Sequence, residues 1–385
     1  MLLNVYNRFN VSFVKGKGVY LYDDQGNEYL DFVSGIAVNC LGHAHPVIAE
    51  ALKKQGETLI HISNLYHSEA QTKLVDKLIG LSKHESVFFS NSGTEANELA
   101  IKIARKFGNN INSNKTEIIY MKDSFHGRST GSLALTGQKK YQEPFEPLIP
   151  NVTECLFNDV NDFISKISEN TCAVILEPVQ GESGIQSASP EFLKVLKEKC
   201  DEYNALLIFD EIQCGMGRMG TLFAYEKLGV VPDVVTIAKA LGGGVPIGAC
   251  LVKGKANDVM VPGDHGSTYG GNPLVCAVAY DVLTELVDNK VIAGVEEKGK
   301  YAADKLNELK EKYDAIEEIR GTGLLIGIKL DEKITAREFA NKAFENKFLL
   351  VPAGNNVLRY FPPLNVTFEE IDKSIVKIEE VLMGI

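Results

Sequence analysis

The spacing of apolar and polar residues changes its period several times along the chain. Residues 18–33 hold two β-rich runs on either side of a Gln-Gly-Asn turn, which predicts a hairpin. From about residue 46 to 285, short apolar runs alternate with longer stretches of helical period. Beyond about residue 290 come a long charged helix, a strand-like run at 321–329 and further alternation. This order is typical of an α/β protein.

These changes predict one large domain and one small one. We expect residues 46–285 to form the large domain, with a mostly parallel central sheet flanked by helices. Residues 1–45 are expected to be an N-terminal part of the small α/β domain, which residues 286–385 complete. The chain has no internal repeat, low-complexity tract or Pro-rich linker, so the domains should pack together.

Six short apolar runs are the predicted strands of the large sheet, and several are apolar throughout, as strands buried on both faces must be. They lie at residues 87–89, 117–121, 172–176, 206–209, 234–237 and 249–252. Polar residues follow them at once. Ligands of open α/β sheets bind beyond the carboxyl ends of the strands, so the chemistry should be sought there.

Composition narrows the classes of partner. The 385 residues are 45% hydrophobic and carry a net charge of -11, with no dense Lys/Arg tract, which disfavours nucleic acid and anionic membranes. The N-terminus lacks the features of a signal peptide, and no stretch has about 20 uninterrupted apolar residues, so we expect a cytoplasmic protein. The seven cysteines suit free thiols in the core better than disulfides or zinc.

Two segments resemble ligand-binding motifs, one for a metal and one for a dinucleotide, but we expect neither to bind that ligand. His43 and His45 have no acidic or thiol partner at ligand spacing, so a turn before a helix is favoured over a metal site. Residues 215–220 match the dinucleotide fingerprint, but five residues separate them from their strand and no clear helix follows. A nicotinamide site and a simple dehydrogenase are therefore disfavoured.

The first predicted strand runs into a helix start that could bind an anion. Apolar residues at 96, 99, 100, 103, 104 and 107 mark one helical face, and Ser92, Gly93 and Thr94 precede it. Free backbone amides at such a position can hold a phosphate. An ordinary Ser/Thr helix cap is an equally good interpretation of these three residues alone.

Two further strand ends carry an acid and a lysine. Asp210 follows the run 206–209, and Lys239 follows 234–237 and leads into three glycines. A pyridine-ring cofactor needs this pair, because the amine forms an imine with it and the carboxylate keeps its ring nitrogen protonated. A salt bridge at the sheet edge is the alternative.

Two more strand ends add candidate ligands for a flat ring and for carboxylates. Phe125 could stack on a ring, and Arg128 could bind a carboxylate through two parallel hydrogen bonds. By themselves they would more often be a core side chain and a solvated charge. The strand at 172–176 runs into Glu177-Pro-Val-Gln-Gly-Glu182.

Seven ordered motifs together resemble the class III, or ornithine-aminotransferase-like, pyridoxal-phosphate enzymes of fold type I. They are residues 31–46, 90–97, 125–128, 177–182, 209–213, the Lys239 segment and residues 266–273. The likeness runs from about residue 10 to the C-terminus. It implies a homodimer with shared active sites.

The resemblance assigns the cofactor site. Lys239 would hold pyridoxal phosphate as a Schiff base and move the proton, and Asp210 would pair with the pyridine nitrogen. Other residues would contact the ring or the phosphate: Gln213 at the ring hydroxyl, Phe125 over the ring face, Gly93 and Thr94 at the phosphate, and Thr268 at the phosphate of the neighbouring subunit.

The resemblance also assigns substrate contacts. Arg128 would bind the α-carboxylate of N2-acetylornithine or the side-chain carboxylate of glutamate, and Arg359 the α-carboxylate of glutamate. Glu182 would shield Arg359 while the ω-amine reacts, and Ser267 would lie beside the substrate. The reaction implied is ping-pong transfer of the 5-amino group to 2-oxoglutarate in arginine biosynthesis.

One departure favours an acylated substrate. Ornithine aminotransferases have a tyrosine before their Gly-His pair, where it helps to recognise a free α-amine, whereas this chain has Ser34-Gly-Ile-Ala-Val38. Ornithine, succinyl-diaminopimelate and 4-aminobutyrate aminotransferases and a glutamate-semialdehyde type aminomutase stay as alternatives. A non-catalytic cofactor-binding relative is disfavoured, because it would not need a proton shuttle and two arginines.

Overall fold

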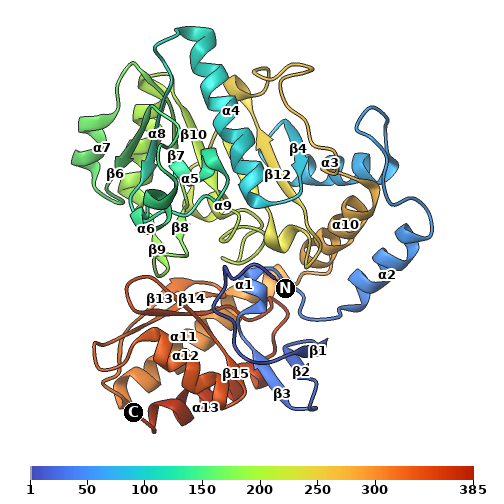
Figure 1. The fold of residues 1–385 in the computed structure, drawn as a ribbon, viewed down its shortest axis with the longest axis vertical. Helices are drawn as coiled ribbons and strands as arrows, with labels where there is room; N and C mark the ends of the chain where they lie inside the picture. Colours follow the sequence, from blue (N-terminus) through green and yellow to red (C-terminus); the bar gives the residue numbers. More distant parts are fainter. Residues whose placement is uncertain (1) are drawn as a thin grey trace.

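The protein has a large seven-stranded sheet in one lobe and two smaller sheets in another (Figure 1). The computed structural model describes residues 2–385. The second lobe combines N-terminal and C-terminal segments, as its blue and red colours in Figure 1 show. The domain limits at residues 45 and 285 stay predictions.

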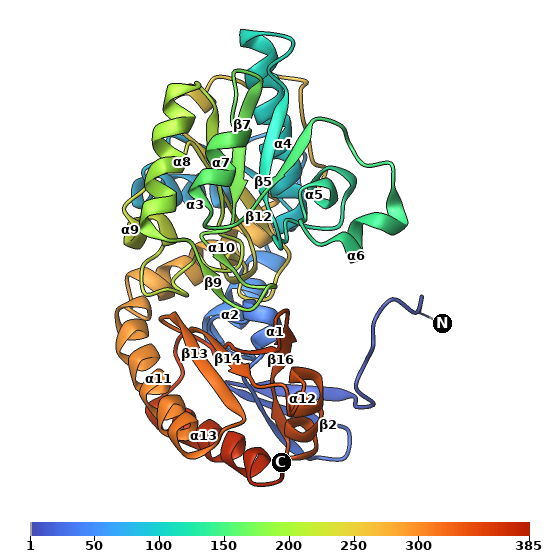
Figure 2. The same ribbon diagram turned by 90° about the vertical axis from the view of Figure 1, so that its left-hand side faces the viewer.

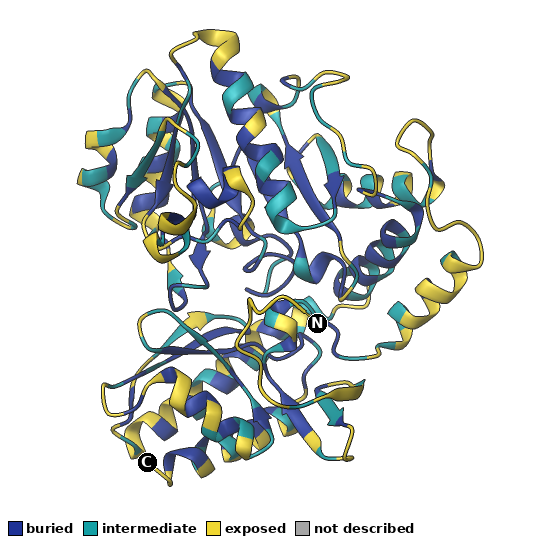
Figure 3. Ribbon diagram, in the orientation of Figure 1, coloured by how far each residue is buried: buried dark blue, intermediate teal, exposed yellow. Residues whose placement is uncertain are grey.

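The large sheet is mostly parallel, as the sequence predicts. Its strands, in spatial order, are β4 (Ser86–Ser90), β12 (Gly248–Val252), β11 (Val234–Ile237), β10 (Leu206–Asp210), β7 (Thr171–Leu176), β5 (Glu117–Met121) and β6 (Val152–Cys155). Only β12 runs against its two neighbours. Four strands, β7, β10, β11 and β12, are buried along their whole length, which explains their continuous apolar sequences (Figure 3). All six predicted strands are present.

Helices cover both faces of this sheet. Ile118 belongs to the same buried cluster as the apolar face of α4 (Gly93–Ile111), whereas its neighbour Ile119 belongs to another cluster, which includes Phe192 of α8 (Pro190–Glu202). Adjacent residues of this strand thus point to opposite faces of the sheet and contribute to two separate hydrophobic clusters. The other helices of the lobe that contains the large sheet are α2 (Pro46–Gly56), α3 (Glu69–Leu81), α5 (Thr130–Ala134), α6 (Lys139–Gln142), α7 (Val160–Lys166), α9 (Ala224–Leu228) and α10 (Pro273–Val287).

The second lobe joins the two ends of the chain through strand pairing. One sheet has the order β1 (Phe13–Lys17), β2 (Tyr20–Asp23), β3 (Glu28–Asp31) and β15 (Phe348–Leu349), so a C-terminal strand completes an N-terminal hairpin. The other sheet has the order β13 (Ile316–Thr322), β14 (Leu325–Leu330), β17 (Val357–Tyr360) and β16 (Val351–Ala353). These sheets pack with α11 (Val295–Lys312), α12 (Ala336–Glu345) and α13 (Phe368–Leu382) (Figure 2).

The predicted strand at 321–329 is wrong in one respect. The run holds the last two residues of β13, a turn at Gly323, whose φ is 59°, and most of β14, which pairs antiparallel with β13. Glycine adopts this left-handed conformation without strain. The rest of β13 was missed because its sequence is rich in charged residues. Among residues 2–385, none of the helices has both the length and the apolar character of a membrane span.

The remaining short elements lie near the lobe junction or at helix ends. They are α1 (Ser34–Ala37), β8 (Val179–Gln180), β9 (Gln186–Ser187), η1 (Glu143–Phe145), η2 (Lys239–Leu241), η3 (Gly254–Ala256) and η4 (Ile292–Gly294). His43 bonds to Asp31 at 2.7 Å, and His45 precedes Pro46 at the start of α2, as the turn interpretation requires.

Candidate active site

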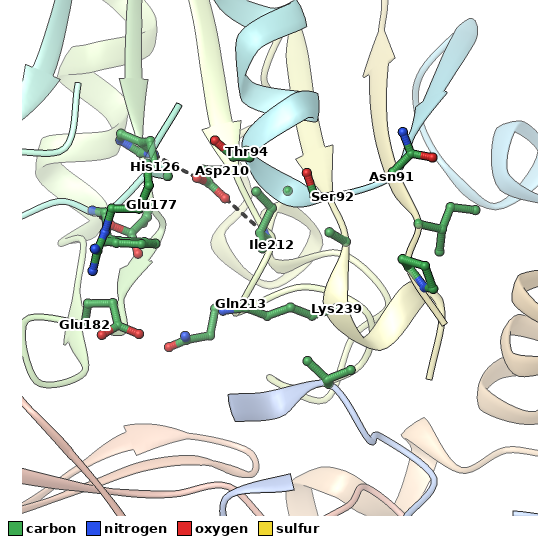
Figure 4. A pocket seen from close by; sticks show the side chains of 18 of the residues that line it. Asn91, Ser92, Thr94, His126, Glu177, Glu182, Asp210, Ile212, Gln213 and Lys239 are labelled. Carbon is green, nitrogen blue, oxygen red and sulfur yellow. Dashed lines mark hydrogen bonds and ion pairs between the residues drawn. The ribbon is translucent and has the colours of Figure 1, made fainter. Parts of the chain in front are cut away.

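A cavity of about 460 Å³ opens at the carboxyl ends of the large sheet (Figure 4). Loops after β4, β5, β7, β10 and β11 line it, and Val38 comes from the end of α1. The residues at these strand ends that the sequence singled out and that line the cavity are Ser92, Gly93, Thr94, Phe125, Arg128, Glu177, Glu182, Asp210, Gln213 and Lys239. Residues up to about 150 positions apart in sequence thus share one site.

Asp210 ends β10 as a buried carboxylate with fixed orientation. Its Oδ2 accepts hydrogen bonds from Asn97 Nδ2 at 2.8 Å and His126 Nδ1 at 2.7 Å, and its Oδ1 accepts one from the Ile212 amide at 3.0 Å. Thr236 Oγ1 donates to Asn97 Oδ1 at 2.8 Å and so holds the amide in place. Hydrogen bonds from three directions hold this carboxylate in one orientation.

Lys239 follows β11 in an uncommon backbone conformation. Its φ is 44°, in the left-handed region that non-glycine residues seldom occupy. Removal from water lowers the pKa of its amine below the usual lysine value, and the acid Glu182 opposes this effect only in part. A backbone outlier and an amine that deprotonates easily are both features of reactive lysines.

The start of α4 lies at another wall of the cavity. Ser92 caps the helix by accepting a hydrogen bond from the Glu95 amide, which leaves the amides of Gly93 and Thr94 near the cavity. A Cβ on Gly93 would lie 2.7 Å from Ile212 Cδ1, so any larger residue there would require the Ile212 side chain to move. Both interpretations of this segment, cap and anion site, are therefore compatible with the structure.

The loop after β5 carries an aromatic ring and a cation. The Phe125 amide donates to Glu177 Oε1 at 2.8 Å, which ties this loop to the end of β7. Burial raises the pKa of Glu177 well above its usual value, and the nearby carboxylate of Asp210 raises it further. Arg128 is exposed, with its guanidinium carbon 4.0 Å from the centre of the Tyr141 ring and 5.5 Å from that of Phe125.

The second predicted arginine, Arg359, is buried and ion-paired, whereas Arg128 is exposed and forms no ion pair with the described residues. Arg359 lies on β17, is 2% exposed, and forms an ion pair with Glu182. Its Nη2 also donates to the carbonyl of Pro352 at 3.0 Å. Burial by itself would raise the pKa of Glu182, but the Arg359 charge outweighs it, and the pKa lies below the usual value.

Three predicted residues, Arg359, Ser267 and Thr268, do not line this cavity in the single chain. Arg359 is connected to it through Glu182, which does line it. Ser267 Oγ accepts hydrogen bonds from Asn91 Nδ2 at 3.1 Å and from the Gly270 amide at 3.0 Å. Thr268 is exposed on the same loop. The expected reach of Thr268 into a neighbouring subunit stays a prediction.

Sequence reasoning gave no role to several residues that organise the site. Asn97 and His126 hold Asp210, Glu177 holds the Phe125 loop, and Tyr141 stacks on Arg128. Asn97 did give a signal, because it is a polar residue beside the apolar stripe of α4 and is fully buried there. Tyr141 gave none, since its contact with Arg128 depends on the path of the chain through α5 and α6.

The chain is similar to known proteins over its whole length. The family model described as "Aminotransferase class-III" matches residues 4–382. The acetylornithine aminotransferase of Clostridium acetobutylicum is 57% identical over 381 residues, which are 98% of each chain. The solved N-acetylornithine aminotransferase of Stenotrophomonas maltophilia has a TM-score of 0.87 at 37% identity, covering 98% of this chain and 97% of that one. The ornithine aminotransferase of Toxoplasma gondii has a TM-score of 0.95 at 34% identity, covering 100% of this chain and 92% of its own.

Proposed function

The chain belongs to the class-III aminotransferase family, and we propose that it transfers the 5-amino group of N2-acetylornithine to 2-oxoglutarate in arginine biosynthesis. The enzyme is an aminotransferase that depends on pyridoxal phosphate. The observation that carries the substrate assignment is the unequal state of two arginines: Arg128 is free, whereas Arg359 is paired with Glu182.

The cavity fits the cofactor by its chemistry. Gln213 Oε1 is buried without a hydrogen-bond partner among residues 2–385, so it can accept from a ring hydroxyl. Gly93 and Thr94 offer backbone amides at a helix start for the phosphate. Asp210 offers a fixed carboxylate for a ring nitrogen, and Phe125 offers an apolar face. We propose that these residues and Lys239 hold the cofactor.

We propose that Asp210 and Lys239 have separate roles in the reaction. When bound, the cofactor supplies an aldehyde that links to amines and a protonated ring that withdraws electrons from the neighbouring carbon. Asp210, held by Asn97 and His126, would keep the ring nitrogen protonated. Lys239 Nζ, with its lowered pKa, would accept the proton that leaves the substrate carbon and deliver it to the cofactor's aldehyde carbon, on the other side of the amine nitrogen.

The two arginines account for two substrates in one site. Acetylornithine has one carboxylate, which Arg128 would bind through its free donors while Glu182 keeps Arg359 masked. Glutamate has two, so Arg128 would take the side-chain carboxylate and Arg359, once released by Glu182, the α-carboxylate. Val38 lines the cavity with an apolar side chain, which suits an acylated amine better than a free one.

We also propose a homodimer with shared active sites. The segment 57–67 and the loop 266–272 are joined by hydrogen bonds from Asn64 Nδ2 to the carbonyls of Ser267 at 3.1 Å and Gly270 at 2.9 Å. Together they expose large apolar side chains, namely Leu59, Ile60, Leu65, Tyr66 and Tyr269. We propose that a second copy of the chain covers this patch. Thr268, which lies beside the patch, would then contact the cofactor phosphate of that second copy. Since the substrates are small metabolites, we propose that the enzyme works in the cytoplasm.

A panel of amines tests the proposed function. Purified enzyme is given 2-oxoglutarate and, in turn, N2-acetylornithine, ornithine, succinyl-diaminopimelate or 4-aminobutyrate, and glutamate formation is followed. We expect the highest kcat/KM with N2-acetylornithine. A higher value with another amine would keep the aminotransferase and move it to another substrate, and glutamate formation from none of them would overturn the proposal.

A further inference from the structure

Arg128 has an unusual environment for a residue that selects substrates. It forms no hydrogen bond or ion pair with any of residues 2–385, and its guanidinium lies over two aromatic rings. An exposed arginine side chain is costly to hold in one conformation, because ordering it loses rotamer entropy. Something other than a carboxylate must therefore set its direction before the substrate arrives.

Tyr141 provides that contact. The guanidinium carbon of Arg128 lies 4.0 Å from the centre of its ring, closer than to Phe125 at 5.5 Å. The two rings meet edge to face, with centres 6.2 Å apart, and form a corner under the guanidinium. Stacking on a ring face leaves all five N–H donors of the arginine free, whereas a bidentate ion pair would occupy two of them.

The tyrosine is itself held firmly. Tyr141 lies on α6, and the next residue, Gln142, is buried and donates from Nε2 to the carbonyls of Leu133 at 3.3 Å and Ala134 at 3.1 Å. These bonds fix α6 to the end of α5, its neighbour in Figure 2, and α5 begins at Thr130, two residues after Arg128. Tyr141 does not line the cavity, whereas Arg128 and Phe125 do, so its influence on a ligand must pass through them.

We propose that Tyr141 is a positioning residue that orients Arg128 for carboxylate binding in both half-reactions. The inference rests on the proposed function, since it assumes that Arg128 binds a carboxylate of each substrate. Lys140 also lies over the Tyr141 ring, 4.8 Å from its centre, but on the exposed side of α6. It offers a control, because its removal changes the local charge without changing the contact between Tyr141 and Arg128.

The test is a double-mutant cycle on the cofactor-loaded enzyme. Tyr141→Leu, Tyr141→Phe, Arg128→Ala, the Tyr141→Leu/Arg128→Ala pair and Lys140→Ala are compared with the wild type. Each half-reaction is started with N2-acetylornithine or with L-glutamate, without an oxo acid, and is followed by the cofactor's visible absorption. The dependence on amine concentration gives an apparent Kd and a rate at saturation.

We expect Tyr141→Leu to raise the apparent Kd of both substrates roughly 5- to 30-fold, as loss of a good cation–π contact would, with little change in the saturated rate. Tyr141→Phe, which keeps a ring, and Lys140→Ala should stay within about twofold of the wild type. In the Arg128→Ala background, Tyr141→Leu should add nothing further, because the residue through which it acts is gone.

Other outcomes overturn the inference. An unchanged Kd in Tyr141→Leu, the same loss in Lys140→Ala, a fall confined to the saturated rate, or equal losses with and without Arg128 would each exclude positioning through Arg128. Reaction of the wild type with glutamate but not N2-acetylornithine would refute the proposed substrate, while the cycle read with glutamate would still decide the role of Tyr141. Reaction with neither would refute both.

Discussion

The two ends of the cavity are built on different principles. At the inner end, Asp210 is buried and receives three hydrogen bonds from residues on separate elements. At the outer end, Arg128 is exposed and stacked on rings. Glu182 also lines the cavity there and holds Arg359, which does not line it, through an ion pair that a substrate carboxylate could replace. The inner end suits a cofactor that stays, and the outer end suits substrates that alternate.

The difference has an energetic basis. Removing one partner of a buried network leaves other polar groups without partners, so the inner end resists rearrangement. Exchanging one carboxylate for another at Arg359 keeps the charge paired throughout, so the outer end can change at small net cost. Changes at the inner end should therefore affect all substrates alike, and changes at the outer end should separate them.

The largest effect is expected from Lys239→Ala. Loss of the amine that moves the proton should lower turnover with every amine by about 10⁴-fold or more, while cofactor binding without a covalent bond stays possible. Steady-state glutamate formation and the absorption of bound cofactor measure the two effects. Lys194→Ala on the exposed side of α8 is the control, and turnover of Lys239→Ala within tenfold of that control would contradict the role of Lys239.

Asp210→Asn should be the next largest. The substitution keeps the shape but removes the negative charge that stabilises a protonated ring nitrogen, so kcat should fall by roughly 10² to 10³-fold with all amines. The measurement is kcat for N2-acetylornithine and for 4-aminobutyrate, with the apparent unfolding temperature as a check of folding. A loss for one amine only would mean that Asp210 acts on the substrate.

A smaller and selective effect is expected from Glu182→Gln. Without its carboxylate partner, Arg359 should be unmasked, so the apparent Kd of glutamate in its half-reaction should fall several-fold, as loss of a charge-assisted competitor implies. The preference for N2-acetylornithine over amines with two carboxylates should shrink at the same time. If glutamate instead bound more weakly, masking by Glu182 would be excluded.

The smallest effect is a pH dependence of stability. The folded pKa of Glu182 lies below the ordinary value of 4.5, so its ion pair contributes stability above about pH 4.5, and this is lost as pH falls through the folded pKa. The wild type should therefore unfold a few degrees higher than Glu182→Gln at pH 6, by about 2–4 °C, with the gap closing below pH 4.5. Thermal melts of the two proteins at pH 4 to 7 measure it. A gap that widens in acid would contradict the sign.

The inner end was also the more predictable part of the sequence. Asp210 and Lys239 follow continuous apolar runs, and strands buried on both faces leave that pattern in any sequence. Strand β6 was not predicted, because Val152–Cys155 is an edge strand with three half-buried residues and mixed polarity. The hairpin of β13 and β14 was missed because β13 is mostly polar and only partly buried, so only β14 leaves an apolar run.

The outer end depends on contacts that a sequence pattern does not encode. Arg359 meets Glu182 from another sheet, 177 positions away, and Tyr141 reaches Arg128 only because Gln142 anchors α6 on α5. The resemblance to a family supplied Arg128, Arg359 and Glu182, but nothing in it pointed to Tyr141. A side chain that acts through a second residue cannot be recognised from the periodicity of the sequence, and the packed structure is needed to identify it.

The most direct test of the two-ended site is the pair of half-reactions of Arg359→Ala, followed by the cofactor's absorption. For glutamate, we expect the saturated rate divided by the apparent Kd to fall about 10²-fold or more, because a bidentate carboxylate contact is lost. For N2-acetylornithine, the same ratio should stay within about threefold of the wild type. Equal losses in both half-reactions would show that Arg359 supports the whole cavity, and would contradict a site that uses its two arginines in turn.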